Sequence, residues 1–185
     1  DFDTARTRTA YERIISDFEK GKTQILIGTQ MLSKGLDFGN VSVVGILSAD
    51  SLMNFPDFRA HERAYQLMVQ VSGRAGRRDK RGTVILQTTQ PEHPLIRMVQ
   101  HFAYKEMVSL QLSERSMFRY PPYYRLIVLI LRSRNEEALQ EMSALYAEKL
   151  RARLGERVLG PVTPPITRVQ TLHIKKIVLK IEISA

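Results

Sequence analysis

The chain has 185 residues, and its 28 Lys and Arg residues against 19 Asp and Glu residues produce a formal net charge of +9. This surplus of cations favours polyanionic partners, although charge alone does not choose among DNA, RNA and acidic proteins. The absence of cysteine excludes a disulfide framework and a thiolate zinc site within these residues, and is consistent with a cytosolic protein. The longest aliphatic run, residues 126–131, is far too short to span a membrane.

The part of the chain before residue 90 has the element order of an α/β layer. A capping box at Thr9–Glu12 and a stop at Gly21 predict a helix over residues 10–20. Apolar runs and helical spacing then predict, in order, strands at 24–28 and 41–47, a helix from about 57 to 71 and a strand at 83–88. This order indicates a parallel sheet with flanking helices.

A polar loop, residues 29–38, joins the first two predicted strands. Open α/β sheets place ligands at the carboxyl ends of their strands, where this loop begins. Thr29 and Gln30 supply donors, Gly35 allows tight backbone geometry, and Asp37 supplies an acceptor. Taken alone, the loop fits a polar connection between strands equally well.

The helix over 57–71 leads into the run Gln70-Val71-Ser72-Gly73-Arg74-Ala75-Gly76-Arg77. Two arginines three residues apart bring two planar guanidinium groups near one anionic ligand, and the glycines let the backbone approach it. The pattern therefore indicates phosphate chemistry. The alternative is a solvated basic end of an amphipathic helix.

Three further features of the sequence could suggest a nucleotide-binding or catalytic role, but none is assigned one. Gly21-Lys22-Thr23 imitates the end of a P-loop, but it follows a helix and precedes a strand, so we reject it as a nucleotide-binding loop. Asp50 follows a strand without an acidic neighbour and has no assigned role. His93 has no potential catalytic partner nearby, so we expect it to cap a helix or lie in a loop.

The pattern of residues from 95 onward predicts a connecting helix and a small α+β domain. The elements expected are a helix over 95–113, a bend at Pro121–Pro122, a strand at 125–132, a helix over 136–154 between an Asn135 cap and a Gly155 stop, and strands near 170–173 and 176–183. The apolar stripe expected on the last helix is Leu139, Met142, Leu145, Tyr146 and Leu150. We place the domain boundary between residues 121 and 122.

Aromatic and basic side chains in this part have two interpretations each. One group either stacks on bases or packs around the proline bend: Tyr104, Phe118, Tyr120, Tyr123 and Tyr124. The other either contacts DNA or forms the charged outer face of a half-exposed sheet: Arg168, His173, Lys175, Lys176 and Lys180.

Taken together, the motifs resemble those of superfamily 2 helicases, with residues 29–38 as motif V and residues 70–77 as motif VI. A narrower resemblance, over most of residues 1–125, is to the PriA family of replication-restart DNA helicases. The segments that carry it are Gly28–Leu32, Lys34–Gly35, Asp57–Ala60, Glu62–Arg63, the arginine run, Gln87–Thr88 and Pro91–Pro94.

The resemblance implies an ATP-dependent 3′ to 5′ DNA helicase that binds stalled forks and promotes primosome assembly. Its implied fold is a second RecA-like helicase lobe with motifs V and VI, residues 1–121, and a truncated C-terminal α+β domain, residues 122–185. Because the chain starts at Asp1 without an initiator methionine, we expect it to be part of a longer protein. The P-loop lobe and a zinc-binding insertion would then precede it.

Each site residue takes a role from the resemblance. Arg74 and Arg77 would stabilise the transferring phosphoryl group of ATP with Mg²⁺, with Gln70 positioning them. The cofactor site would also include Gly73, Gly76, Gly35 and Asp37, and the DNA contacts would be Thr29, Gln30, Lys34, Arg168, Lys175 and Lys176. No metal ligand is expected within the chain.

The implied partners are forked and single-stranded DNA, primosome proteins and single-strand-binding proteins in a bacterial cytoplasm, at the nucleoid, and no membrane. Without a P-loop, the chain by itself is expected not to hydrolyse ATP. Two alternatives stay open: a non-catalytic nucleic-acid-binding module, and a scaffold that docks other restart proteins through residues 125–185.

Overall fold

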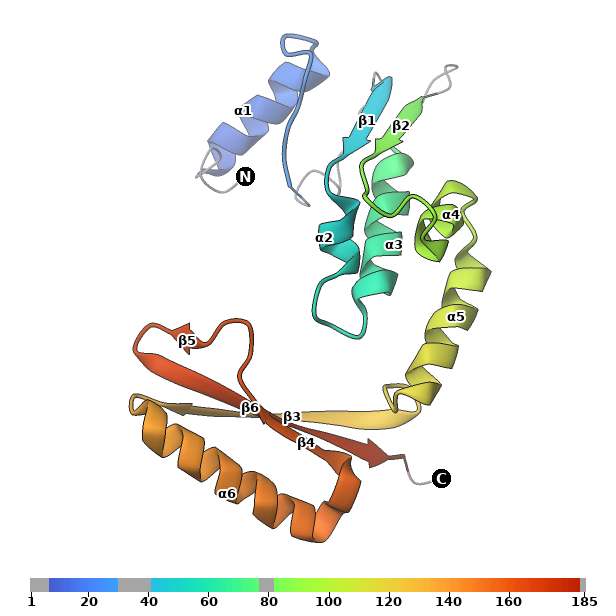
Figure 1. The fold of residues 1–185 in the computed structure, drawn as a ribbon. Helices are drawn as coiled ribbons and strands as arrows, with labels where there is room; N and C mark the ends of the chain where they lie inside the picture. Colours follow the sequence, from blue (N-terminus) through green and yellow to red (C-terminus); the bar gives the residue numbers. More distant parts are fainter. Residues whose placement is uncertain (1–6, 30–40, 77–81, 184–185) are drawn as a thin grey trace. The chain divides into compact units, whose positions relative to one another are not determined.

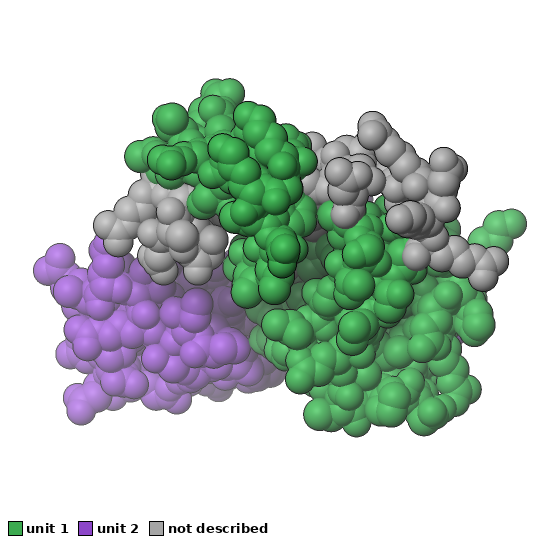
Figure 2. All heavy atoms as spheres, turned by 90° about the horizontal axis from the view of Figure 1, so that it is seen from above, with its two compact units in different colours: residues 1–111 green, residues 112–185 purple. Residues whose placement is uncertain are grey.

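The computed structural model describes residues 7–29, 41–76 and 82–183 (Figure 1). These residues form two compact units, 1–111 and 112–185, which Figure 2 shows in different colours. The division falls within helix α5, Tyr104–Met117, whereas the sequence placed the domain boundary after residue 121. The predicted mixture of α and β structure is confirmed, with a small parallel sheet in the first unit and an antiparallel sheet in the second.

The first helix, α1, spans Arg8–Glu19. Its N-cap is Thr7, whose side chain accepts a hydrogen bond from the Ala10 amide at 3.2 Å. The predicted capping box at Thr9 is therefore wrong by two residues, because Thr7 offers the same hydroxyl one step before the helical backbone begins. The predicted stop is confirmed, since Gly21 has a φ of +69° directly after the C-cap residue Lys20.

The parallel pair of the first unit consists of β1, Val43–Ile46, and β2, Thr83–Leu86. The strand predicted at 24–28 is not formed: these residues have no strand hydrogen bonds, and Ile25 and Ile27 are 77% and 83% exposed. An apolar run shows a tendency to be buried, but a strand also needs a hydrogen-bonded neighbour, which the pattern of one segment does not supply.

Helices α2, Ala49–Met53, and α3, Ala60–Ser72, follow β1, and helices α4, Pro94–Gln100, and α5 follow β2. The single helix predicted over 95–113 is wrong, because Phe102 has a φ of +52° and interrupts it between α4 and α5. One core joins all four helices to β1: Ile46, Ala49, Met53, Ala64, Tyr65, Met68, Leu95, Ile96, Met98, Val99 and Met107.

The second unit is an antiparallel sheet with helix α6, Glu136–Leu154, on one face (Figure 1). Its strands are β3, Tyr124–Ser133, β4, Val158–Val162, β5, Arg168–Val169, and β6, Leu172–Glu182, with β6 between β3 and β4 and also paired with β5. A short 3₁₀ helix, Gly155–Arg157, joins α6 to β4. The Asn135 cap and the Gly155 stop are both confirmed, at a φ of +60° for Gly155.

Two strand predictions in this unit fail for identifiable reasons. β4 was not predicted because it contains Gly160 and Pro161, yet an end strand of a sheet tolerates them at the irregularity between Leu159 and Val162. The strand expected at 170–173 is instead a turn at Gln170, where φ is +55°, followed by the start of β6.

The buried face of α6 differs from the predicted stripe. Leu139 is buried as expected, but Met142, Leu145 and Tyr146 are 54%, 43% and 51% exposed. Ser143 and Ala147 are completely buried instead. Small side chains let the helix backbone approach the sheet closely, so the face with the smaller residues packs inward.

Candidate functional site

The predicted phosphate-binding run lies at the carboxyl end of α3. The apolar face of α3, with Ala64, Tyr65 and Met68 buried, fixes the helix in the core of the first unit. The chain leaves the helix at Gly73, whose amide donates to Val69 O at 3.0 Å. The prediction that this helix delivers the arginine run at its end is confirmed for Gln70 and Arg74, the two members of the predicted set that the structure describes.

Arg74 lies in the turn directly after α3, where its amide donates to Val71 O at 3.0 Å. The residue is half-buried, and its Nε atom is shielded from solvent. Gln70 is exposed and lies in the last turn of α3, four residues before Arg74. Arg77 lies outside the described residues.

Two glycines shape this turn. Gly76 has a φ of +80°, and its amide donates to Val41 O at 3.1 Å, next to the start of β1. Gly82 lies where the chain returns toward β2, and a Cβ there would overlap with backbone atoms of Ala75 and Gly76. The chain directly after Arg74 is therefore held against Val41 by a hydrogen bond and against Gly82 by a close approach.

The predicted DNA-contacting loop is described only at its first residue. Thr29 is exposed at the end of the unpaired segment 24–28. Gln30, Lys34, Gly35 and Asp37 lie outside the described residues. We call the turn after α3, residues 73–76, the arginine turn. The structure does not show how the predicted loop lies relative to it.

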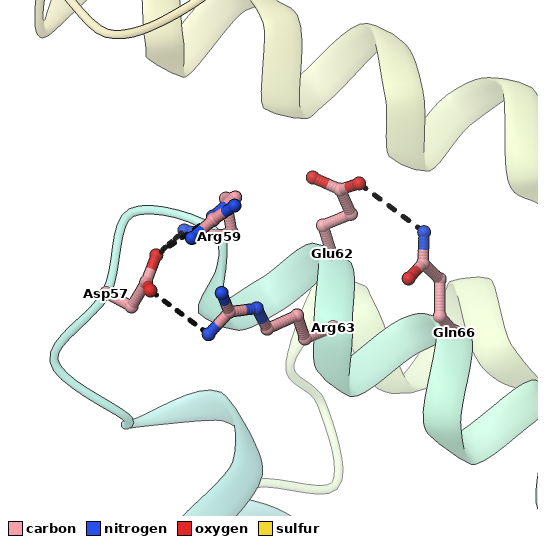
Figure 3. A network of polar contacts seen from close by, with 5 residues as sticks. All are labelled: Asp57, Arg59, Glu62, Arg63 and Gln66. Carbon is pink, nitrogen blue, oxygen red and sulfur yellow. Dashed lines mark hydrogen bonds and ion pairs between the residues drawn. The ribbon is translucent and has the colours of Figure 1, made fainter. Parts of the chain in front are cut away.

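A charged network surrounds the start of α3 (Figure 3). Asp57 Oδ1 accepts from the amide and Nε of Arg59 at 2.8 and 3.4 Å, and Oδ2 pairs with Arg63 Nη1 at 3.0 Å. Burial by itself would raise the pKa of Asp57, but the hydrogen bonds from Arg59 and the charges of Arg59 and Arg63 hold that pKa below its ordinary value. The ionised carboxylate thus anchors the beginning of the helix whose other end carries Arg74.

Asp50, which the sequence left without a role, connects the segments that follow the two parallel strands. It lies in the first turn of α2 and accepts from Thr88 Oγ1 at 2.5 Å, from the Thr89 amide at 2.9 Å and from Thr89 Oγ1 at 2.7 Å. The hydrogen bond from Thr88, followed by those from Thr89, lowers the pKa of Asp50. The sequence contained a signal for this contact. Asp50 follows one predicted strand, and two adjacent threonines follow the next strand of the predicted βαβ unit, whose carboxyl ends lie at the same edge of a parallel sheet.

His93 caps α4, as expected from the sequence. Its Nδ1 accepts a hydrogen bond from the Leu95 amide at 3.2 Å. Its ring also contacts that of His61 edge to face, with 5.4 Å between the centroids. These contacts give His93 a structural role at the junction of α3 and α4.

The basic residues of the second unit do not form the single face that the sequence predicted. Lys175 and Lys176 are neighbours in β6, so their side chains point to opposite faces of the sheet. A pocket of about 230 Å³ lies on the Lys175 side. It is lined by Glu136, Leu139, Thr163, Thr167, Arg168, His173, Ile174 and Lys175.

Polar contacts between side chains organise this pocket. Lys175 Nζ donates to Thr163 Oγ1 at 2.9 Å, and His173 Nδ1 lies 3.4 Å from Glu136 Oε2. Arg168, in the short strand β5, is exposed at the rim. The cations and hydroxyl groups suit an anionic group such as a phosphate. Lys176 lies outside this set.

The described residues hold no group of three or more His, Cys, Asp or Glu side chains that could bind a metal ion. Of the helices within residues 7–29, 41–76 and 82–183, none is long and apolar enough to cross a bilayer.

Two protein-family models match the chain. Residues 2–79 match the helicase conserved C-terminal domain, and residues 116–185 match the primosomal protein N C-terminal domain. The first match contains both Arg74 and Arg77, and the second begins at the end of α5.

Curated relatives match over nearly the whole chain. The chain is 42% identical over 186 aligned positions to the replication restart protein PriA of Bacillus subtilis, which covers 97% of the chain and 23% of that protein. It is 41% identical over 172 positions to the protein of the same name from Synechocystis sp., with 91% and 21% covered. For the Treponema pallidum protein the identity is 36% over 181 positions, with 96% and 28% covered. The chain therefore spans between about a fifth and under a third of the length of these relatives.

Proposed function

The chain belongs to the PriA family of replication restart proteins, and from this we propose that it supplies one helicase lobe and part of the C-terminal domain of an ATP-dependent 3′ to 5′ DNA helicase. The observation that carries the proposal is the arginine turn at the end of α3, where Gly82 approaches the backbone of Ala75 and Gly76 closely. We infer that the first unit has a RecA-like architecture. The full-length protein would act on stalled forks in the bacterial cytoplasm, at the nucleoid.

The arginine turn suits a site for the transferring phosphoryl group of ATP. Phosphoryl transfer is catalysed mainly by placement and electrostatic stabilisation, and guanidinium groups stabilise the charge on the equatorial oxygens. Arg74 and Arg77 would take this role, with Gln70 holding them in position. Gly73 and Gly76 would let the backbone come close to the phosphates, and Mg²⁺ bound with ATP would neutralise further charge.

A P-loop would have to come from another lobe, because this chain contains none. We therefore propose that the chain alone hydrolyses no ATP. In the helicase, Gly35 and Asp37 would couple nucleotide binding to DNA contacts by Thr29, Gln30 and Lys34.

The second unit would add phosphate contacts. Arg168 and Lys175 at the pocket suit the phosphates of forked or single-stranded DNA, and Lys176 would contact DNA from the opposite face of the sheet. Primosome and single-strand-binding proteins are the proposed protein partners. The second candidate function is a nucleic-acid-binding module without a role in catalysis. The observation that favours it is the pocket beside Lys175.

The test measures DNA-stimulated ATP hydrolysis and DNA affinity of the full-length helicase at one fixed salt concentration. Arg74→Ala and Arg77→Ala should each lower turnover, by about 10³-fold or more if they act as arginine fingers do. DNA affinity should stay close to normal. Arg97→Ala, which removes an exposed arginine on α4, is the matched control and should change neither quantity. Normal turnover with weakened DNA binding would instead place the arginines on the DNA surface and support the binding module.

A further inference from the structure

The segment that joins α5 to β3 exposes a cluster of large apolar side chains. Met117, Phe118 and Tyr123 are 73%, 58% and 44% exposed. We call these three residues the junction patch. Tyr120 belongs to the same segment but is used differently, because Lys180 Nζ lies 3.7 Å from the centroid of its ring. Of the five aromatic residues singled out in the sequence, three are exposed, Tyr104, Phe118 and Tyr123, and two are half-buried, Tyr120 and Tyr124.

The backbone beneath the junction patch is held by hydrogen bonds to both neighbouring elements. Lys180 Nζ, from β6, donates to Phe118 O at 2.6 Å. The Tyr120 amide donates to Arg115 O at 2.8 Å, and the Tyr123 amide donates to Tyr120 O at 3.1 Å. Exposed rings on a backbone that is already ordered lose little conformational entropy when a ligand binds.

Positive charge surrounds the junction patch. Arg119 and Arg125 are exposed within the same segment and at the start of β3. Burial, and then the charge of Arg119, lower the pKa of Lys180. Glu182, the acid at the end of β6, accepts a hydrogen bond from Arg157 Nε at 2.6 Å. This bond, followed by the smaller effect of the charge of Arg119, lowers the pKa of Glu182.

A surface that binds single-stranded nucleic acid without reading its sequence combines exposed aromatic rings with nearby cations. The rings stack on bases, and the cations contact the intervening phosphates. A docking site for an apolar protein segment needs no such cations. The charge around the patch therefore favours nucleic acid over a neutral protein surface.

We propose that Phe118 and Tyr123 form a stacking platform for the bases of single-stranded DNA, with Arg119 and Arg125 holding its phosphates. This inference rests on the proposed function, since single strands are what a DNA helicase produces. It extends that function by assigning base contacts to a surface distinct from the predicted motif V loop and from the pocket beside Lys175.

The test uses the complete 185-residue chain and two fluorescein-labelled probes of equal length at one fixed ionic strength. One probe is oligothymidylate, and the other is its abasic counterpart, which keeps the phosphates and lacks the bases. Fluorescence anisotropy should show that Phe118→Ala and Tyr123→Ala each weaken oligothymidylate binding by about five-fold or more, the range found for a stacked base. Binding of the abasic probe should be unchanged.

Three further variants sharpen this test. Phe118→Trp keeps an aromatic face and should keep affinity, while Tyr146→Ala removes a 51% exposed aromatic ring from α6 and should have no effect. The chain contains no tryptophan, so its intrinsic fluorescence comes from tyrosine. Oligothymidylate should quench it in the original chain, and Tyr123→Phe should keep affinity while reducing the quenching.

The outcomes separate this inference from the function on which it rests. Equal losses on both probes, or an equal loss in Tyr146→Ala, would show that bases do not stack at the junction patch. Unchanged affinity in both alanine variants would overturn the platform and leave the proposed helicase function standing. If the original chain bound neither probe, the platform and the DNA contacts proposed for this chain would both be wrong, whereas the ATPase test would still decide the role of the arginines. Thermal unfolding of each variant should match that of the original chain, because the altered side chains are exposed.

Discussion

The backbone of Gly82 lies against the backbone of Gly76, so closely that a Cβ on Gly82 would overlap with the amide nitrogen of Gly76. One glycine ends the described part of the arginine turn and the other begins the return toward β2. The arginine turn is therefore closed by an approach of the chain that leaves no room for a side chain at residue 82.

Gly82→Ala should destabilise the chain and displace the arginine turn, because the obstructing atoms are backbone atoms of Ala75 and Gly76 and the Cβ of Ala75, none of which can rotate away. Forced overlap in a packed site costs about 1 to 3 kcal/mol. Urea unfolding measures the loss of stability, and the ATP hydrolysis that we propose for the full-length protein would report the displacement of the turn. Gly45→Ala, in β1, is the matched control, since a Cβ there has no atom within 4 Å. Equal stability of the two variants would show that the close approach is not maintained in solution.

Asp50 should make the stability of the chain depend on acid pH. Its pKa in the folded chain lies below its ordinary value of 3.8, chiefly because of the hydrogen bond from Thr88. The carboxylate therefore contributes stability that is fully present above the ordinary pKa and is lost as the pH falls through the lower, folded value. Urea unfolding at neutral pH and near pH 3 should show this loss.

Variants of Thr88 test whether the hydrogen bond causes this pH dependence. Thr88→Val removes the donor hydroxyl and should reduce the difference in unfolding free energy between the two pH values. Thr88→Ser keeps the hydroxyl and should preserve most of it. If the valine and serine variants showed the same pH dependence as the original chain, the contact between Asp50 and Thr88 would not contribute to stability.

The orientation of α6 can be tested by enlarging a small residue and truncating a large one. Ala147 is fully buried, so Ala147→Leu should overpack the interface with the sheet and cost about 1 to 3 kcal/mol. Met142 is 54% exposed, so Met142→Ala should change the unfolding free energy by no more than about 0.5 kcal/mol. Circular dichroism during urea unfolding measures both. The opposite ranking would restore the stripe that the sequence predicted.

Predictions that depend on a few neighbouring residues were the most reliable. The helix stop at Gly21 and the caps at His93 and Asn135 all occur where the sequence indicated. Each depends on a hydrogen bond or a backbone angle within one turn of the chain, so the residue type nearly determines the structure. Thr9 is the exception, because Thr7 provides an equivalent cap nearby.

Predictions that depend on distant partners were less reliable. Residues 24–28 are as apolar as a buried strand, but the run does not say which strand lies beside it. Val158–Val162 contains a glycine and a proline, but its position beside β6 makes it a strand. In both cases hydrogen bonding to another part of the chain decides the outcome, and local composition does not include it.

The sequence by itself determined the parallel pairing of residues 43–46 with residues 83–86 and the family to which the chain belongs, because residue types and their spacing carry that information directly. Only the tertiary structure decided that Asp50 joins Thr88 and Thr89, that Lys175 and Lys176 serve different faces, and that Ala147 rather than Met142 faces the sheet. These outcomes depend on which surfaces meet, and side-chain volume and hydrogen-bond partners from distant segments settle that only when the chain is folded.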